Sequence, residues 1–382
     1  MNGAGGRPTP PPYDPQLTDA LVWFKATFEP IPLLPGNIQE NRAIVAAITP
    51  SLASALEGHD GVVSSERVAA GPRGEIELTV VEPAVRTAAP RPAALVIHGG
   101  GLVLGDRFFA AGEAIGLAER YGVVAVLVEY RRAPEFPGTA PVEDCYAALQ
   151  WIEAHAGELH VDLARVVVTG FSAGGGLSAG VALMARDLGG PRLAGQLLGC
   201  PMLDDRDATA STRQFDGIGV WDRTNNRTAW SAVLGPEPRG EVSPYAAPAR
   251  ATDLSGLPPA FVDVGGAEVF RDEAVDYASR IWAAGGSAEL HVWDGGFHGF
   301  AGFAPEAWAS RASAVVTDSW WRRVLRLDGA VPGSQSTVAS ASEAAAVPGS
   351  PHPAADPDPA AAPATAEGEP GQGGEPAPSG RA

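Results

Sequence analysis

The pentapeptide Gly170-Phe171-Ser172-Ala173-Gly174 constrains the fold of this chain more than any other feature. It follows a β-branched run at 165–169 that predicts a buried strand, and it precedes a helical pattern over 174–188. The pattern G-x-S-x-G between a strand and a helix makes a sharp turn that pushes the serine hydroxyl out of the sheet. Its glycines leave room for strained backbone and for close helix packing. The pentapeptide therefore predicts Ser172 as a nucleophile at the carboxyl end of a buried strand.

A second glycine-rich turn, His98-Gly99-Gly100-Gly101, follows the apolar run at 93–97. Attack on an ester places negative charge on the carbonyl oxygen, and this charge needs preorganised N–H donors. Consecutive glycines let backbone N–H groups approach a substrate without an intervening side chain. We therefore predict that the N–H groups of Gly99, Gly100 and Ala173 form an oxyanion hole. The alternative is a flexible glycine turn without a catalytic role.

Apolar strands and amphipathic helices alternate along most of the chain. Strands are predicted at 75–82, 94–97, 123–130, 165–169, 194–199, 259–265 and 288–293, and helices at about 108–121, 140–156, 174–188, 272–284 and 305–327. This alternation predicts an α/β fold with a mostly parallel central sheet flanked by helices, preceded by a half-buried antiparallel strand at 75–82. In such sheets, chemistry gathers at the carboxyl ends of the strands.

Composition divides the chain into one domain and two tails. Residues 1–16 and 329–382 are rich in small residues and proline, so we predict two disordered tails around a domain at 17–328. Within that domain, 17–60 and 203–256 do not fit the alternation. We predict that they form a helical cap over the strand ends, where a cap would exclude water. The alternative is an ordinary surface insertion with its own small core.

A serine nucleophile needs a base and an acid that orients the base. Among seven histidines, His298 lies in a glycine-rich loop directly after the last predicted strand. Glu268 lies in the loop after the preceding strand. Asp272 and Glu273 open the next helix, where negative charge is favourable in any case. We therefore predict a Ser172–His298–Glu268 triad, with Asp272 as the competing acid.

These motifs resemble those of the bacterial hormone-sensitive-lipase-like esterases, the alpha/beta-hydrolase fold-3 family. The matching stretches are His98–Gly101, 129–135, Gly170–Gly175, 268–273 and 298–300. The resemblance implies an α/β-hydrolase fold, a cap built from the N-terminal segment and a later insertion, and cofactor-free hydrolysis of short- to medium-chain acyl esters. Two positions depart from the family pattern. Phe171 replaces a frequent acidic residue, and Glu268 stands where aspartate is more common.

The triad and the resemblance together favour a serine carboxylesterase that works through an acyl-enzyme. A lactone hydrolase or an amide or formamide hydrolase would use the same triad. A third alternative, a catalytically silent ligand-binding protein on the same fold, would be expected to lack a triad member.

Charge and composition argue against several other roles. The net charge is −18 and no basic patch is evident, which argues against nucleic acid and anionic membranes as partners. No apolar run reaches transmembrane length and no secretory signal is evident, so we expect a cytoplasmic protein. Cys145 and Cys200 suggest neither a disulfide framework nor a metal cluster. We expect no cofactor and a small-molecule ester as the partner. Assembly into a homo-oligomer stays open.

Overall fold

A single twisted sheet organises the chain. The computed structural model describes residues 8–28, 31–236 and 239–327. Within them, eight strands form a sheet in the order β1-β2-β4-β3-β5-β6-β7-β8. The pairs β1–β2 and β2–β4 are antiparallel, and every other neighbouring pair is parallel. The strands are β1 Val62–Gly71, β2 Gly74–Pro83, β3 Arg91–Ile97, β4 Val124–Val128, β5 Val161–Phe171, β6 Gly195–Gly199, β7 Ala260–Gly265 and β8 Ala288–Trp293.

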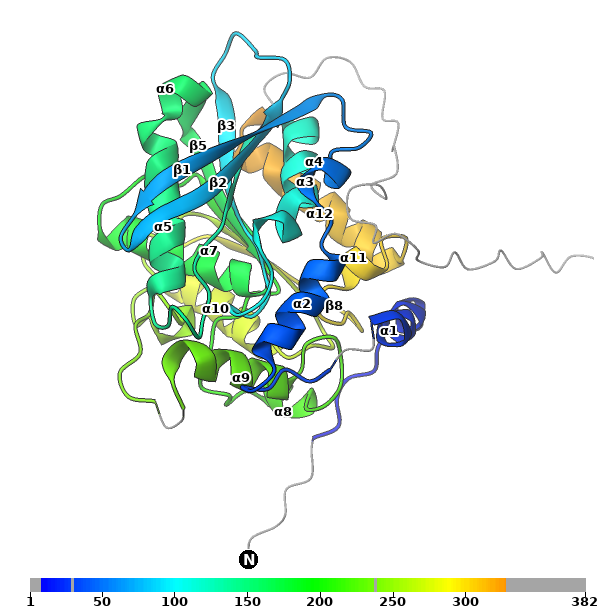
Figure 1. The fold of residues 1–382 in the computed structure, drawn as a ribbon. Helices are drawn as coiled ribbons and strands as arrows, with labels where there is room; N and C mark the ends of the chain where they lie inside the picture. Colours follow the sequence, from blue (N-terminus) through cyan, green and yellow to red (C-terminus); the bar gives the residue numbers. More distant parts are fainter. Residues whose placement is uncertain (1–7, 29–30, 237–238, 328–382) are drawn as a thin grey trace, which may run out of the picture. The chain divides into compact units, whose positions relative to one another are not determined.

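Helices connect the strands and cover both faces of the sheet (Figure 1). The α-helices are α1 Pro15–Phe28, α2 Ile38–Ile48, α3 Leu52–Ala55, α4 Ala111–Tyr121, α5 Ala140–Ala154, α6 Ala156–Leu159, α7 Ala173–Asp187, α8 Ala210–Gln214, α9 Arg223–Leu234, α10 Arg271–Ala283, α11 Phe300–Phe303 and α12 Trp308–Val324. Two short 3₁₀ helices, η1 Arg107–Ala110 and η2 Pro248–Arg250, complete the described elements.

The two faces of the sheet have separate hydrophobic cores. Leu95 and Val126 belong to the core that α5, α7 and α10 cover, whereas their neighbours Val96 and Leu127 belong to the core under α4 and α12. Successive strand residues point to opposite faces, so strands buried on both sides must be apolar throughout. This explains why β3 and β4 are buried along their whole length. The predicted mostly parallel α/β architecture is confirmed.

Two details differ from the sequence prediction. Strand β1 was not predicted, because its polar centre around Ser64 and Glu66 hides the alternation, and this edge strand is only partly buried. Within the predicted cap segment at 17–60, the sequence has one helical pattern over 40–56, but in the structure this stretch is divided between α2 and α3. Pro50 explains the break, since a residue before proline avoids helical backbone, and Thr49 is extended at φ −79° and ψ 120°.

The N-terminal segment packs on the domain earlier than predicted. Helix α1 begins at Pro15, and the ring of Tyr13 lies 6.3 Å from the rings of both Phe215 and Phe297. Asp14 donates its backbone N–H to the carbonyl of Gly295 at 3.1 Å. Residues 8–16 therefore contact the domain, although they were assigned to a tail. Residues 1–7 and the predicted C-terminal tail at 329–382 lie outside the described residues, so disorder there stays a prediction.

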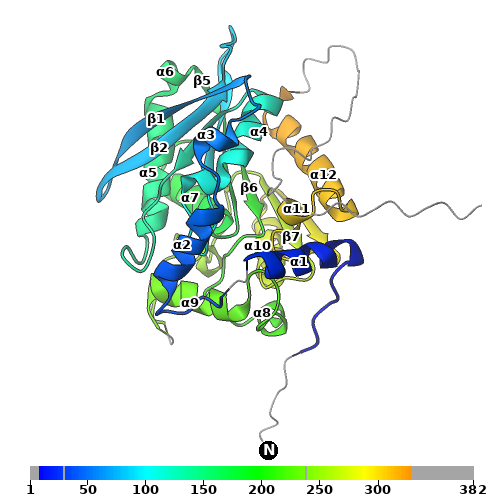
Figure 2. The ribbon, with the colours of Figure 1, turned by 45° about the vertical axis from the view of Figure 1, so that its right-hand side comes forward.

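Helices α1, α2, α8 and α9 gather at one end of the sheet (Figures 1 and 2). They come from the two segments that were predicted to form a cap. The two segments are joined to each other, because the Leu33 N–H donates to Asn225 Oδ1 at 2.8 Å. The residues before α1 also contact the second segment, since Gln214 Nε2 donates to the carbonyl of Thr9 at 2.9 Å. The cap therefore remains our interpretation of a cluster that two distant parts of the sequence build together.

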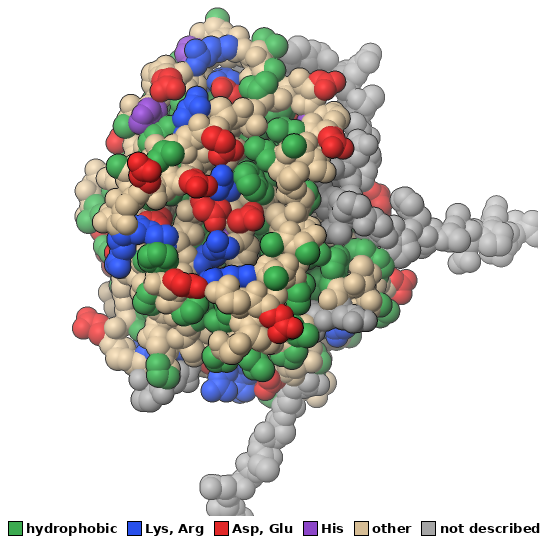
Figure 3. All heavy atoms as spheres, in the orientation of Figure 1, with side chains coloured by type: hydrophobic (Ala, Val, Ile, Leu, Met, Phe, Trp, Pro, Cys, Tyr) green, Lys and Arg blue, Asp and Glu red, His purple; other side chains and the backbone are tan. Residues whose placement is uncertain are grey.

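The surface mixes charges of both signs. Figure 3 shows acidic and basic side chains interspersed on one face of the molecule. Opposite charges are also paired in the structure: Arg107 contacts Glu66 and Glu77 at 3.2 and 2.7 Å. Among the described residues, no helix combines the length and the apolar character that crossing a membrane requires.

Candidate active site

Ser172 lies at a strained turn between the end of β5 and the start of α7. Its backbone has φ 58° and ψ −120°, which an L-residue adopts only at a cost. The flanking glycines lack a Cβ atom, which lets neighbouring backbone pack directly against the turn. A Cβ at Gly174 would lie 2.0 Å from the carbonyl oxygen of Ile97, and one at Gly170 would lie 2.4 Å from that of Gly174. The G-x-S-x-G spacing thus reflects close backbone packing on both sides of the serine.

In the predicted triad, His298 lies within hydrogen-bond distance of both Ser172 and Glu268. His298 Nε2 lies 3.0 Å from Ser172 Oγ, and His298 Nδ1 lies 2.6 Å from Glu268 Oε2. Glu268 Oε1 accepts a hydrogen bond from the N–H of Gly265 at 2.8 Å, which fixes the carboxylate. The exposed fractions are 4%, 6% and 2% for Ser172, His298 and Glu268. The group can therefore move a proton away from the serine in a site that excludes most water.

Two aromatic rings hold the imidazole of His298. The ring of Phe171 lies 5.1 Å from it in a tilted arrangement, and the ring of Phe270 lies 5.2 Å away, edge to face. Phe171 is one of the two positions that depart from the family pattern. Phe270 was not identified from the sequence, because an apolar residue in the acid's loop gives no signal of contact with a histidine 28 residues later. Both rings restrict the orientation of the base.

The predicted oxyanion loop, defined here as residues 98–104, lies directly beside the nucleophile. A Cβ at Gly99 would lie 2.9 Å from the carbonyl oxygen of Phe171 and 3.3 Å from Ser172 Cβ. Gly100 has φ 110°, and a Cβ there would lie 2.3 Å from the carbonyl oxygen of Leu104. Ala173 is the first residue of α7, where a backbone N–H has no partner within the helix. The loop and the helix start therefore bring the three predicted N–H donors close to Ser172.

His98 supports this loop but is unsuited to proton transfer. Burial, only partly offset by a bond to the Gly99 carbonyl, lowers the pKa of His98 to about 3. Its ring stacks on Tyr130 with centroids 4.2 Å apart, and the Tyr130 hydroxyl donates to the His98 carbonyl at 3.1 Å. His98 is consequently neutral at working pH and has a structural role.

We predict that Gly99→Ala lowers kcat by about tenfold to a hundredfold, because small misplacements near reacting atoms cost that much. The new Cβ would meet the backbone of Phe171, which cannot move without displacing Ser172. The measurement is the steady-state hydrolysis of a p-nitrophenyl ester. Gly157→Ala is the matched control, since its Cβ would meet nothing within 4 Å. Equal rates for the two variants would contradict the role of Gly99.

The two competing acids have other partners. Asp272 accepts the backbone N–H of Ser211 and the Nε of Arg271, both at 2.8 Å. Although burial opposes ionisation, the bonds from Arg271 and Ser211 hold the pKa of Asp272 below its ordinary value. Glu273 accepts the N–H groups of Leu203 and Asp204, while burial raises its pKa well above the usual range. Both carboxyl groups thus join the start of α10 to the segment after β6.

Cys200 is an unpredicted neighbour of the candidate triad. Its Sγ, a carboxylate oxygen of Glu268 and a ring nitrogen of His298 lie within 4.8 Å of one another. The thiol is buried, and burial raises its pKa well above the ordinary value. Sulfur, oxygen and nitrogen ligands of this kind suit zinc. However, Glu268 and His298 are already hydrogen-bonded to each other. We therefore interpret these two residues as a candidate proton-transfer pair and not as metal ligands.

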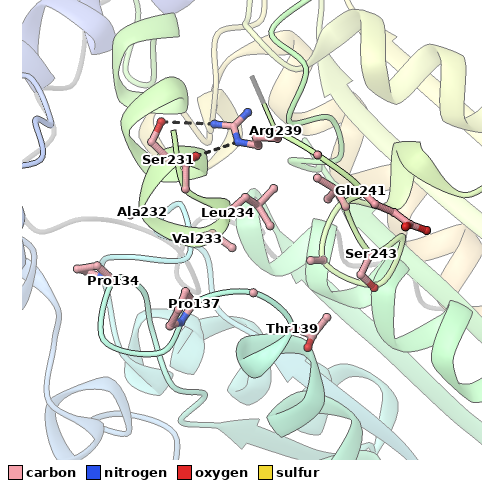
Figure 4. A pocket seen from close by; sticks show the side chains of 15 residues that line it. Pro134, Pro137, Thr139, Ser231, Ala232, Val233, Leu234, Arg239, Glu241 and Ser243 are labelled. Carbon is pink, nitrogen blue, oxygen red and sulfur yellow. Dashed lines mark hydrogen bonds between the residues drawn. The ribbon is translucent and has the colours of Figure 1, made fainter. Parts of the chain in front are cut away.

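A separate pocket of about 580 Å³ lies between the C-terminal half of α9 and the segment before α5 (Figure 4). Leu234, Pro137 and Thr139 are among its lining residues. Arg239 also lines it, and its guanidinium is held by the carbonyl of Asp205 at 2.6 Å. None of the predicted catalytic residues lines this pocket, so it is not the candidate active site.

Comparisons with known proteins agree with the geometry. A family model described as alpha/beta hydrolase fold matches residues 94–302. The esterase LipI of Mycobacterium tuberculosis is 36% identical over 248 residues, which cover 61% of this chain and 73% of that protein. The carboxylesterase NlhH of the same species is 37% identical over 223 residues, which cover 56% of this chain and 67% of that protein.

Among solved structures, a bacterial heroin esterase matches with a TM-score of 0.75 and 39% sequence identity. The match covers 82% of this chain and 98% of that one. It therefore extends beyond the segment of the family model. Ser172, Glu268 and His298 all lie within that segment, at residues 94–302.

Proposed function

This chain belongs to the alpha/beta hydrolase fold family, among the hormone-sensitive-lipase-like esterases, and we propose that it hydrolyses short- to medium-chain acyl esters through Ser172, His298 and Glu268. The observation that carries the proposal is the continuous hydrogen-bonded path from Ser172 Oγ through His298 to Glu268. A nucleophile, a base and an orienting acid in this arrangement suit acyl transfer. The names of the similar proteins, which are esterases, support the same reaction class.

In the proposed first half-reaction, Ser172 Oγ attacks the acyl carbon while His298 Nε2 takes its proton. Glu268 holds the Nδ1–H tautomer of His298 and stabilises the imidazolium. The N–H groups of Gly99, Gly100 and Ala173 bind the oxyanion. His298 then returns the proton to the leaving alcohol, which leaves Ser172 acylated. In the second half, His298 removes a proton from water, the hydroxide attacks the acyl-enzyme, and Ser172 is regenerated with release of the carboxylic acid.

The surroundings of Ser172 favour small acyl groups. Trp221 lies over the oxyanion loop, where its ring would be 2.4 Å from a Cβ at Gly101. Ala229 of α9 lies against the same glycine. Phe215 and Phe297, both buried, enclose the nearby Tyr13. Large apolar side chains from the predicted cap segment at 203–256, together with Tyr13 and Phe297, thus crowd the strand ends, which supports a preference for short or medium acyl chains.

A fluorophosphonate probe tests the proposal directly, because it reacts only with an activated serine. We expect stoichiometric labelling, mapped by peptide mass spectrometry to the peptide that contains Ser172. A parallel series of p-nitrophenyl esters should give the highest kcat/KM with short or medium chains, and p-nitroanilides should be turned over far more slowly. Absence of labelling would refute a serine mechanism, and faster anilide turnover would point to an amide hydrolase.

A further inference from the structure

The oxyanion loop has a backbone that needs external support. Gly100, Gly101 and Leu102 all have positive φ, at 110°, 62° and 65°. Leu102 is not a glycine, so its conformation is unfavourable and persists only when its surroundings hold it. The N–H groups of Val103 and Leu104 both donate to the carbonyl of Gly100, at 3.1 and 2.8 Å, which closes a tight turn. Any contact that fixes this turn also fixes the N–H groups of Gly99 and Gly100.

The segment after β4 supports the loop from within the domain. The Ala133 N–H donates to the carbonyl of Leu102 at 3.0 Å. Arg132 Nη1 donates to the carbonyl of Gly105, and Tyr130 donates to that of His98. The domain therefore holds both ends of the loop and one point in its turn. The Val103 carbonyl is bound by a different part of the chain.

That part is α2, one of the predicted cap helices. Arg42 Nε donates to the carbonyl of Val103 at 2.7 Å, and its Nη2 donates to the carbonyl of Ala133 at 2.8 Å. The same guanidinium makes a forked bond to both carboxylate oxygens of Glu135, each at 2.8 Å. Arg42 is 18% exposed, whereas Val103 and Ala133 are fully buried. One side chain thus joins the cap, the oxyanion loop and the segment that supports the loop.

We propose that Arg42 is a positioning residue for the oxyanion hole, and that it couples the seating of α2 to the geometry of the Gly99 and Gly100 N–H groups. This inference rests on the proposed function. Arg42 touches no reacting atom and acts only through the backbone of the oxyanion loop.

The ion pair with Glu135 orients Arg42 but is not the essential part. Glu135 is 45% exposed, and ion pairs at such positions contribute little to stability. The bond from Arg42 lowers the pKa of Glu135 to about 2, so the carboxylate stays ionised and the fork persists at any working pH. The bonds from Arg42 to the carbonyls of Val103 and Ala133 matter more than this ion pair. Their loss would leave two buried carbonyls without this donor and would remove support from the strained backbone of the oxyanion loop. Catalysis should therefore respond to loss of Arg42 much more than to loss of the Glu135 charge.

The test compares Arg42→Met with Glu135→Gln in the full chain. Methionine keeps the apolar stem and removes every donor, whereas Glu135→Gln leaves Arg42 free to bind both carbonyls. The concentration of active enzyme in each preparation is determined by fluorophosphonate titration, so that misfolded enzyme does not lower the measured kcat. We expect Arg42→Met to lower kcat on a p-nitrophenyl ester by about tenfold to a hundredfold, with KM changed less than about threefold, since an oxyanion hole acts on the transition state. Glu135→Gln should stay within about threefold of the wild-type kcat.

A trifluoromethyl ketone gives a second readout, because it forms an oxyanion adduct with the nucleophile. Its Ki should rise for Arg42→Met by about the factor that kcat falls. Wild-type kcat in Arg42→Met, or an equal loss in Glu135→Gln, would overturn the assignment. If Arg42→Met does not fold, Arg42→Lys replaces it. Lysine cannot reach both carbonyls and Glu135 with one planar group, so we expect a several-fold loss of kcat, and an unchanged kcat would overturn the assignment.

The two proposals fail in different ways. If the wild-type chain is not labelled at Ser172, the serine mechanism is wrong, and the role of Arg42 is overturned with it. If wild-type labelling and turnover are normal while Arg42→Met is unimpaired, only the role of Arg42 is overturned.

Discussion

Replacing Ser172 by alanine is expected to lower kcat by about 10⁴-fold or more while the fold is retained. The variant removes the atom that lies 3.0 Å from His298 Nε2, so no acyl-enzyme can form. Alanine has no hydroxyl to desolvate, and the turn at position 172 already carries its backbone strain, so the thermal midpoint should change little. Ester hydrolysis, fluorophosphonate labelling and thermal unfolding are the three measurements.

Ser178, in the helix α7 that begins directly after Ser172, provides a matched control. It is also fully buried, and its hydroxyl donates to the carbonyl of Gly174 at 2.8 Å. Ser178→Ala removes a buried hydroxyl near the turn but leaves the nucleophile, so labelling at Ser172 should persist. Retention of a tenth of the wild-type rate by Ser172→Ala would contradict the assignment of the nucleophile.

The fold could be predicted from the sequence because its main constraints are local. A strand covered on both faces must be apolar at every position, and β4 at Val124–Val128 is buried throughout. Such runs alternate with amphipathic segments, which leaves a doubly wound sheet as the natural arrangement. The candidate nucleophile could also be identified from the sequence. The glycines around Ser172 are needed because neighbouring backbone approaches too closely for a Cβ atom, and their spacing is visible in the sequence.

Long-range contacts explain what the sequence did not reveal. Arg42 lies in α2 without a recognisable motif, and its acceptors Val103 and Ala133 are 61 and 91 residues away. The contact of Phe270 with His298 likewise depends on how two loops meet at the sheet edge. Tyr13 was assigned to a tail because proline-rich sequence around it shows no apolar period, yet it packs between Phe215 and Phe297. Secondary-structure propensities and the periodicity of apolar residues carry no information about such long-range contacts.

Replacing Glu268 by glutamine is expected to lower kcat by roughly 10³-fold, up to about 10⁴-fold, with little change in KM. Glu268 Oε2 accepts from His298 Nδ1, which leaves Nε2 free to take the serine proton. A glutamine amide at that position would donate to Nδ1 and favour the tautomer whose proton is on Nε2. That tautomer cannot accept a proton from Ser172. The loss should therefore appear in kcat, because the carboxylate acts on the imidazolium that forms in the transition state.

Asp272→Asn separates this role from a general need for negative charge near the start of α10. Asp272 accepts from Ser211 and Arg271, so its loss should lower the free energy of unfolding by about 1 kcal/mol and leave kcat nearly unchanged. Steady-state kinetics and denaturant unfolding of both variants decide the matter. If Asp272→Asn abolishes turnover and Glu268→Gln does not, the acid is wrongly assigned. The pairing of Ser172 with His298 would survive that result, because it depends on a separate contact from the loop after β8.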